Sequence, residues 1–279
     1  MLRTFILFLT LTVILLAVGF VLGGIAGMTG ALIFAGFINF FSYWYSDKIV
    51  LRLYGATKTL DEGLKETVRK LANEAEIPVP EIYIIPSEHP NAFATGRNPE
   101  HSAVAITRGL TKLTKSELEG VIAHEIAHIK HRDTLVQTVA ATLGGAISYL
   151  AMIGYWSLFR RDGNRDGAGM LIGIVLIAIF APLAATLIKL AISRRREYAA
   201  DHEGALLTRN PGALATALMK ISEDTSHSRI HGNSATSHMW IVNPFRSDWF
   251  TGMFSTHPPI KRRIAKLERM TGKFGGENE

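Results

Sequence analysis

A charge-free interval between Arg3 and Asp47 is the feature that most limits how this chain can fold. One helix needs about 20 apolar residues to cross a bilayer, so this interval is too long for one span and suits two. The glycine-rich stretch GGIAGMTG separates two apolar runs and has the composition of a tight turn. We therefore predict a transmembrane helical hairpin in residues 1–47.

The spans of this hairpin are predicted at Phe5–Leu22 and Ala31–Tyr45. The second is short, but it ends in Trp44 and Tyr45, aromatic residues that favour the headgroup boundary. A cleaved signal peptide is the alternative, because Arg3 precedes the apolar run and the tripeptide AVG resembles a cleavage site. The apolar sequence continues far beyond that tripeptide, which favours the hairpin.

A second pair of apolar runs, Leu135–Trp156 and Leu171–Ile192, predicts an inserted membrane hairpin in residues 135–192. Lys189 is the only charged residue in these runs, and it lies close enough to an end to reach the headgroups. A pair of buried core helices is the alternative, which the length of both runs disfavours.

The basic residues set the predicted orientation and explain the net charge of +6. Lysine and arginine near the span ends favour the cytoplasmic side, and anionic headgroups account for their number. The larger group, predicted to be cytoplasmic, is Arg3, Lys48, Arg52, Lys130, Arg132 and Arg194 to Arg196, against Arg160, Arg161 and Arg165. We expect the lipid bilayer, and no nucleic acid, as the partner of these charges.

Residues 48–134 and 193–279 remain as the soluble part, and together they can form one domain. Apolar residues at helical spacing, Leu60, Leu64, Val68 and Leu71, predict a helix, while PEIYIIP and SAVAITRGL have the composition of short strands. The predicted fold class is α+β, mainly helical with a small β-sheet, in addition to the two membrane hairpins.

The segment EGVIAHEIAHIKHRD contains the residues most suited to chemistry. Thr114 and Glu117 form a capping-box pattern, so a helix is expected to begin there. Within that helix, His124 and His128 are four residues apart and share a face, and Glu125 follows the first. Two such histidines can bind one zinc ion, with the glutamate as a base for water.

A catalytic zinc site needs a third protein ligand, and the chain has no cysteine to supply it. A further histidine or a carboxylate can do so. His131 is predicted to lie outside the ligand set, at the surface or behind a ligand. Glu197 in REYAAD is the better candidate, because Asp201 follows it by one helical turn and can orient a ligating imidazole.

The whole pattern resembles the HtpX-type membrane zinc metalloproteases, relatives of the CAAX prenyl proteases among the gluzincins. The matching motifs are HEIAH, REYAAD, NAFATG and STHPPIKRRI, with the flanking apolar hairpins. The resemblance implies a zincin-like domain with one Zn²⁺ per chain, held by His124, His128 and Glu197. It also implies that Glu125 acts as the general base and acid of peptide hydrolysis.

Two further residues are candidates with ordinary alternatives. His257 in the HPP motif is a candidate donor to the oxyanion, or simply a histidine at a helix start. Asn91 in NAFATG is a candidate substrate contact, or a turn residue after proline, and SAVAIT is a candidate edge strand for an extended substrate. His227, His231 and His238 fall in a long polar stretch and are predicted to be solvated.

The predicted function is hydrolysis of damaged or misfolded membrane proteins at the cytoplasmic face of the cell inner membrane, with soluble unfolded chains as a second substrate class. A metal transporter is disfavoured, because the predicted spans contain no His, Asp or Glu. A catalytically inactive metal-binding scaffold remains the alternative, and the presence of Glu125 argues against it.

Overall fold

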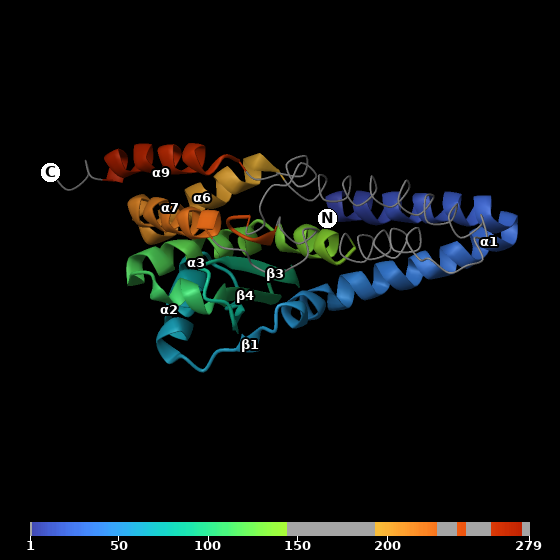
Figure 1. Cartoon of the computed structure of the whole chain (residues 1–279), viewed down its shortest axis with the longest axis horizontal. Coiled ribbons are helices and arrows are strands. Elements are labelled where there is room, and N and C mark those ends of the chain that lie inside the picture. The colour runs from blue at the N-terminus through green and yellow to red at the C-terminus, as the bar shows by residue number, and fades with distance from the viewer. Residues whose placement is uncertain (1, 144–192, 228–238, 244–257, 275–279) are drawn as a thin grey trace, which may run out of the picture.

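The structure is a computed structural model that describes residues 2–143, 193–227, 239–243 and 258–274 (Figure 1). A long helical arm extends from one end of a mixed helical and β-sheet body. Most of the hairpin predicted at 135–192 lies outside the described residues, and so does His257.

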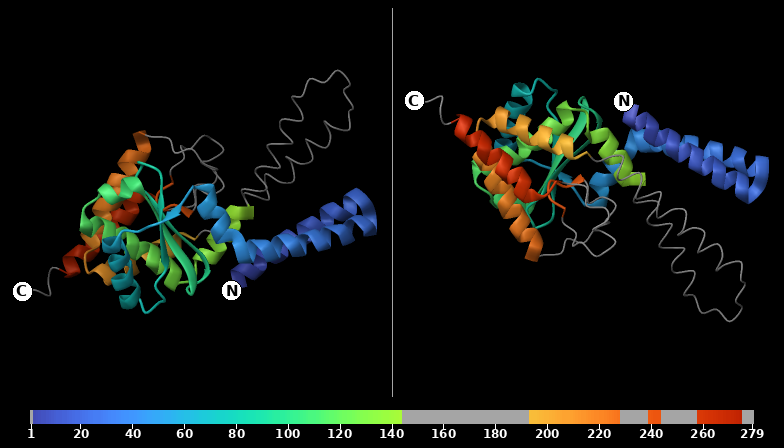
Figure 2. Two further views of the ribbon diagram at one scale, coloured as in Figure 1. Left: turned by 90° about the horizontal axis from the view of Figure 1, so that it is seen from below. Right: turned by 90° about the horizontal axis from the view of Figure 1, so that it is seen from above.

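The arm is α1 (Leu2–Leu53), which reverses direction at Gly23 and Gly24. Gly24 has a φ of 57°, a conformation that favours glycine. The two halves of α1 lie side by side (Figure 2), and Asn39 Nδ2 donates to Thr12 Oγ1 between them at 3.0 Å. The predicted turn is therefore present as a glycine reversal between two antiparallel helical segments.

Much of the apolar surface of α1 faces outward, which suits contact with lipid. Within the described residues, one helical stretch, Gly23–Leu53, is long and apolar enough to cross a membrane, while Phe5–Phe20 and Thr134–Leu143 are shorter apolar helices. The large exposed side chains include Phe5, Leu9, Phe20, Leu32, Phe34, Phe37, Phe40 and Trp44.

The body contains α2 (Glu62–Glu74), the 3₁₀ helix η1 (Arg108–Lys112), α3 (Lys115–Lys130), α6 (Arg194–Thr208), α7 (Pro211–His227) and α9 (Ile260–Phe274). The predicted capping box of α3 is confirmed, with both Thr114 and Glu117 making their reciprocal bonds. The predicted start of α2 is wrong at Leu60, which is 88% exposed. Asp61 caps α2 instead, because its carboxylate accepts from the Leu64 N–H.

The sheet has four strands in the order β1-β2-β4-β3. They are β1 (Thr57–Lys58), β2 (Glu81–Ile85), β3 (Ala92–Asn98) and β4 (His101–Thr107). β2 and β4 are parallel, whereas β1 with β2 and β3 with β4 are antiparallel. The prediction that SAVAIT forms an edge strand is wrong, because β4 lies between β2 and β3. The strand at that edge is β3, formed by the NAFATG motif.

Both faces of the sheet are buried at β3 and β4, so alternate residues of these strands enter different cores. On β4, Val104 and Ile106 pack with α2, α3 and α7, while Ala103 and Ala105 pack against the end of α1 and Trp240. This arrangement places β3 beside α3 on one face and beside α1 on the other.

Candidate metal centre

The centre forms where α6 crosses α3, and a glycine permits the close approach. A Cβ at Gly204 of α6 would lie 3.0 Å from the backbone nitrogen of His124, closer than ordinary packing allows. On another side of α3, Gly120 similarly meets Leu214 of α7, at 3.1 Å from its nitrogen. The Gly204 contact brings Glu197 of α6 to the histidine face of α3.

His124, His128 and Glu197 converge and are all buried. The two Nε2 atoms are 3.2 Å apart. Glu197 Oε1 lies 3.5 Å from His128 Nε2, and Glu197 Oε2 lies 3.9 Å from His124 Nε2. The residues predicted as ligands are therefore brought together from two helices.

This donor set has the dimensions and the chemistry of a metal site. Zinc bonds of about 2.0–2.1 Å in tetrahedral geometry separate neighbouring donors by about 3.4 Å. The three separations lie near that value. Two imidazole nitrogens and one carboxylate oxygen are also a common ligand set for catalytic zinc, and a buried cluster of this kind is otherwise unfavourable.

His124 is oriented by a carboxylate and an arginine from distant parts of the chain. Its Nδ1 lies 3.0 Å from Asp201 Oδ1. Arg263 of α9 donates to both Asp201 oxygens, at 2.8 and 2.7 Å, and is fully buried. Burial, assisted by the charge of Arg263, lowers the pKa of His124 to about 4, which keeps the ring neutral and able to bind a metal.

His128 also lies beside a carboxylate that is paired with an arginine, and this carboxylate follows it by only five residues. Its Nδ1 lies 3.4 Å from Asp133 Oδ2, and Arg196 donates to Asp133 Oδ1 at 2.6 Å. Arg132 makes this possible, because its φ of 57° turns the chain back and the Asp133 N–H reaches the His128 carbonyl. Burial opposes the charged ring, but Asp133, Glu197 and Glu125 outweigh burial and raise the pKa of His128 to about 9.

Glu125 is buried beside the ligands. Burial, together with the charge of Glu197, raises its pKa to about 7, although His128 and a hydrogen bond from the Ala94 N–H oppose this. A carboxylate with a pKa near 7 is suited to accept and return a proton at neutral pH.

Arg263 was not singled out by the sequence interpretation. Besides Asp201, its guanidinium lies 3.3 Å from His124 Nε2 and 3.4 Å from Glu197 Oε2. The sequence does indicate that Arg263 is unusual, since it falls between Ile260 and Leu267 on the apolar face of α9. A charge on a buried helix face needs partners, which here are the ligands and Asp201.

Asn91 precedes β3 and is buried. Its side-chain Nδ2 donates to the Val242 carbonyl at 2.8 Å, and the Ile241 N–H donates to the Ala92 carbonyl at 3.0 Å. Arg263 also donates to the Ile241 carbonyl at 2.9 Å. Residues 239–243, which we call the strap, are thus held between β3 and the metal centre.

The remaining histidines of interest lie elsewhere. His131 is the exposed cap residue of α3, in agreement with its predicted surface position. His227 ends α7. His231, His238 and His257 lie outside the described residues.

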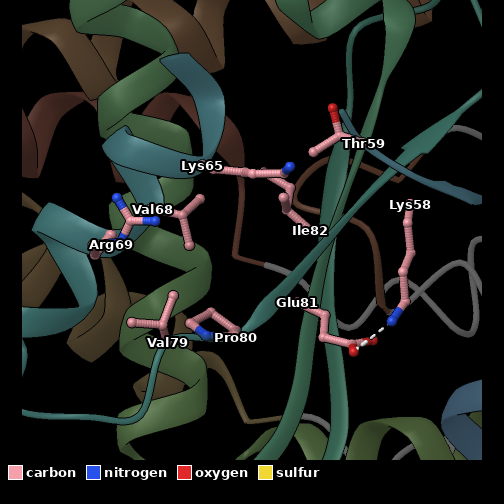
Figure 3. A pocket seen from close by; sticks show the side chains of 9 residues that line it. All are labelled: Lys58, Thr59, Lys65, Val68, Arg69, Val79, Pro80, Glu81 and Ile82. Atoms are coloured by element: carbon pink, nitrogen blue, oxygen red, sulfur yellow. Dashed lines mark hydrogen bonds and ion pairs between the residues drawn. The ribbon is translucent and has the colours of Figure 1, made fainter. Parts of the chain in front are cut away.

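A surface hollow of about 250 Å³ between α2 and β2 is separate from the centre, since none of the ligands lines it (Figure 3). Its one drawn ion pair joins Lys58 to Glu81 at 2.6 Å. Its lining residues are Lys58, Thr59, Lys65, Val68, Arg69, Val79, Pro80, Glu81 and Ile82.

Comparisons with known proteins agree with this geometry. The model of peptidase family M48 matches residues 58–271. A protein of Pyrococcus furiosus described as "Protease HtpX homolog" is 51% identical over 280 residues, covering 98% of this chain and 96% of that protein. One of Aquifex aeolicus with the same description is 48% identical over 274 residues, covering 95% and 91%.

A solved structure has a similar fold. The crystal structure of S. mikatae Ste24p matches with a TM-score of 0.51 and 18% identity, covering 92% of this chain. This chain spans 61% of the length of that structure, and at this identity the likeness concerns the fold alone.

Proposed function

The chain belongs to peptidase family M48 and is a membrane metalloprotease, and we propose that it is a zinc endopeptidase for damaged or misfolded membrane proteins. The observation that carries this proposal is the convergence of His124, His128 and Glu197 beside the buried base Glu125. Soluble unfolded polypeptides are a second proposed substrate class.

We propose Zn²⁺ as the metal, one per chain, because the ligand set lacks thiolates and combines two imidazoles with one carboxylate. When bound, zinc would supply Lewis acidity that polarises a peptide carbonyl and activates water. Asp201 supports this by holding the proton on His124 Nδ1, so that Nε2 presents its lone pair to the metal.

Glu125 performs the proton transfers in the proposed reaction. Its carboxylate accepts a proton from the attacking water and then returns it to the departing amine. The Ala94 N–H lies near enough to this carboxylate to lower its pKa, which supports a position beside the outer edge of β3, where an extended substrate would lie. His257 is proposed as the donor to the developing oxyanion.

Asn91 is proposed to contact the substrate backbone. Its amide now binds Val242 of the strap, and an extended substrate would offer the same carbonyl and N–H groups in place of the strap. The proposal is therefore that Asn91 exchanges one backbone partner for another.

For the whole chain, we propose a membrane hairpin at 1–47, a second at 135–192, and a protease domain made of 48–134 and 193–279. The domain is proposed to face the cytoplasm at the cell inner membrane, where the basic residues beside the spans would lie. This position would suit cleavage of cytoplasmic loops and tails of membrane proteins, as part of protein quality control.

The test is proteolysis of an unfolded membrane-protein substrate by purified, zinc-loaded protein, beside Glu125→Gln. We expect cleavage by the wild type and a loss of at least about a hundredfold in the variant, because general base catalysis contributes at least that much. Equal zinc content in the two proteins is the control. A variant as active as the wild type would exclude Glu125 as the base, and an inactive wild type would favour the metal-binding scaffold.

A further inference from the structure

The direction of β3 relative to α1 bears on which membrane proteins fit the site. Two contacts fix that direction. Phe93, near the start of β3, packs against Tyr54 with ring centroids 5.8 Å apart. Arg97, near its end, lies over Trp44 with its guanidinium carbon 4.5 Å from the ring centre. β3 therefore runs back along α1, from Tyr54 towards Trp44.

Of these two contacts, the one at Trp44 lies nearer the proposed bilayer. Trp44 falls within the membrane-length stretch Gly23–Leu53, whereas Tyr54 lies just beyond its end. Four residues of strand separate Phe93 from Arg97, a distance of about 13 Å. The end of β3 is thus closer to the membrane than its start by roughly that length.

The outward-facing groups of β3 follow from its pairing with β4. The Thr107 N–H donates to the Asn91 carbonyl, so Asn91 faces β4 and alternate residues face away from it. The Ala92 carbonyl accordingly receives the Ile241 N–H, and the Ala94 N–H reaches Glu125. A substrate that is cleaved beside Glu125 would therefore lie along this outer edge.

The strap shows in which sense a chain runs on this edge. Ile241 bonds Ala92, and the next residue, Val242, bonds the side chain of Asn91, which precedes Ala92. Residue numbers therefore increase along the strap in the direction in which they decrease along β3, so the two segments are antiparallel. Antiparallel pairing is also slightly the more stable arrangement.

We infer that substrate pairs antiparallel with β3 and enters from the membrane end, so that the preferred substrates carry their membrane anchor on the N-terminal side of the cleaved bond. This inference rests on the proposed function. The N-terminal side of a substrate that pairs antiparallel with β3 lies near Arg97, and its C-terminal side lies near Asn91. Glu125 lies between these two positions. A chain anchored before the cleavage point reaches the edge directly, whereas one anchored after it must first turn back towards the bilayer.

The test uses two substrates that share one cleavable segment and one transmembrane anchor. The anchor precedes the segment in the first and follows it in the second, with a spacer of about 5 residues, which spans at most about 18 Å. Both are reconstituted with zinc-loaded full-length protein in the same vesicles, with the segment on the protease-domain side. The unanchored segment and Glu125→Gln serve as controls.

We expect the first substrate to be cleaved at least about tenfold faster, because its segment has the higher effective concentration at the edge. The advantage should fall towards equal rates when both spacers are lengthened to about 30 residues, since a long flexible linker reaches the edge from either side. Each cleavage product is identified by its mass, which confirms that the same bond is cut.

Equal rates with the short spacer, or a faster second substrate, would overturn the inference while leaving the protease function intact. If the unanchored segment were cleaved and neither anchored substrate were, the inference would be overturned too, because neither anchored chain would then reach the site. Cleavage of the unanchored segment beside the first substrate agrees with the inference, since soluble unfolded chains are the second proposed substrate class. If the wild type cleaves none of the three faster than Glu125→Gln, the proposed function itself fails.

Discussion

His124 and His128 lie one turn apart on α3, but the two sides of the metal centre are built differently. Behind His124, Asp201 and Arg263 come from α6 and α9, and both are buried. Behind His128, Asp133 follows in the same segment, and the side chain of its partner Arg196 is 17% exposed. The same carboxylate and arginine pairing thus occurs once in the core and once near its edge.

This difference separates a pair of residues that serves both the fold and the candidate metal site from a pair that serves mainly the candidate site. The Arg263 pair joins α6, α9 and the strap, so its loss affects the packing of the body. The Asp133 pair lies where apolar residues Thr134–Leu143 begin and where α6 starts. It ties the proposed base of the second membrane hairpin to the proposed metal ligand His128, and its loss should leave most of the core in place.

The largest expected effect is that of Asp201→Ala. It leaves Arg263 buried without its bidentate partner, and breaking a buried ion pair in this way costs about 3–5 kcal/mol. Denaturant unfolding of the metal-free protein in detergent measures the loss, with Asp133→Ala as the matched variant at the other histidine. Equal losses in the two variants would contradict the proposed contrast between core and edge.

Asp133→Ala is expected to weaken metal binding more than it weakens the fold. His128 loses the carboxylate beside its Nδ1, and removing such a partner typically lowers metal affinity by about 10–100-fold. Competition with a chelator of known affinity measures the change, and Asp133→Asn, which retains an acceptor oxygen, should recover part of it. Unchanged affinity in the alanine variant would show that Asp133 does not position the ring.

The pH dependence of the metal-free protein should distinguish the two histidines. The pKa of His124 is lowered to about 4 in the folded protein, so between about pH 6.5 and pH 4 this ring binds a proton only in the unfolded state. Stability therefore falls as the pH drops from about 6.5 towards 4. The pKa of His128 is raised to about 9, so its contribution is complete below about 6.5 and is lost as the pH rises through 9.

The test compares the variants His124→Gln and His128→Gln, with an expected effect on the order of 1–2 kcal/mol on each limb. The first should flatten the acid side of the stability profile and the second the alkaline side. Unfolding curves between pH 5 and 9 measure both. Because the charge of His128 helps to lower the pKa of His124, His128→Gln should also lessen the loss of stability on the acid side. If His124→Gln left the acid limb unchanged, or His128→Gln left the alkaline limb unchanged, the assignment of the two pKa shifts would be wrong.

The sequence was most informative where structure is set locally. The capping box at Thr114 and the spacing of His124 and His128 depend only on helical geometry, and the structure has the helix as predicted. Glu197 was found by ligand chemistry and by its spacing from Asp201. Arg263 and the place of β3 at the sheet edge depend on how distant segments pack, so local patterns did not predict them.

Asp133 is an intermediate case, because its position depends on one unusual residue. Arg132 and Arg209 have φ values of 57° and 51°, and each follows a helix of the metal centre. A side chain in this conformation is strained by about 1 kcal/mol, which glycine relieves at some cost in chain entropy. We expect Arg132→Gly and Arg209→Gly each to stabilise the protein by a few tenths of a kcal/mol, up to about 1.

Metal affinity should respond differently to substitutions at Arg132 and at Arg209. Arg132→Gly keeps the turn that returns Asp133 to His128, so affinity should stay within about twofold, whereas a β-branched valine resists this conformation and should displace Asp133. We expect Arg132→Val to lower the affinity towards that of Asp133→Ala, and Arg209→Val to cost similar stability without changing it. Because both valine variants carry the same backbone strain, a loss of metal at Arg132 alone would identify this turn as what positions the Asp133 carboxylate. Equal metal affinities in the two valine variants would instead show that the centre binds metal equally well when the turn that positions Asp133 is disturbed.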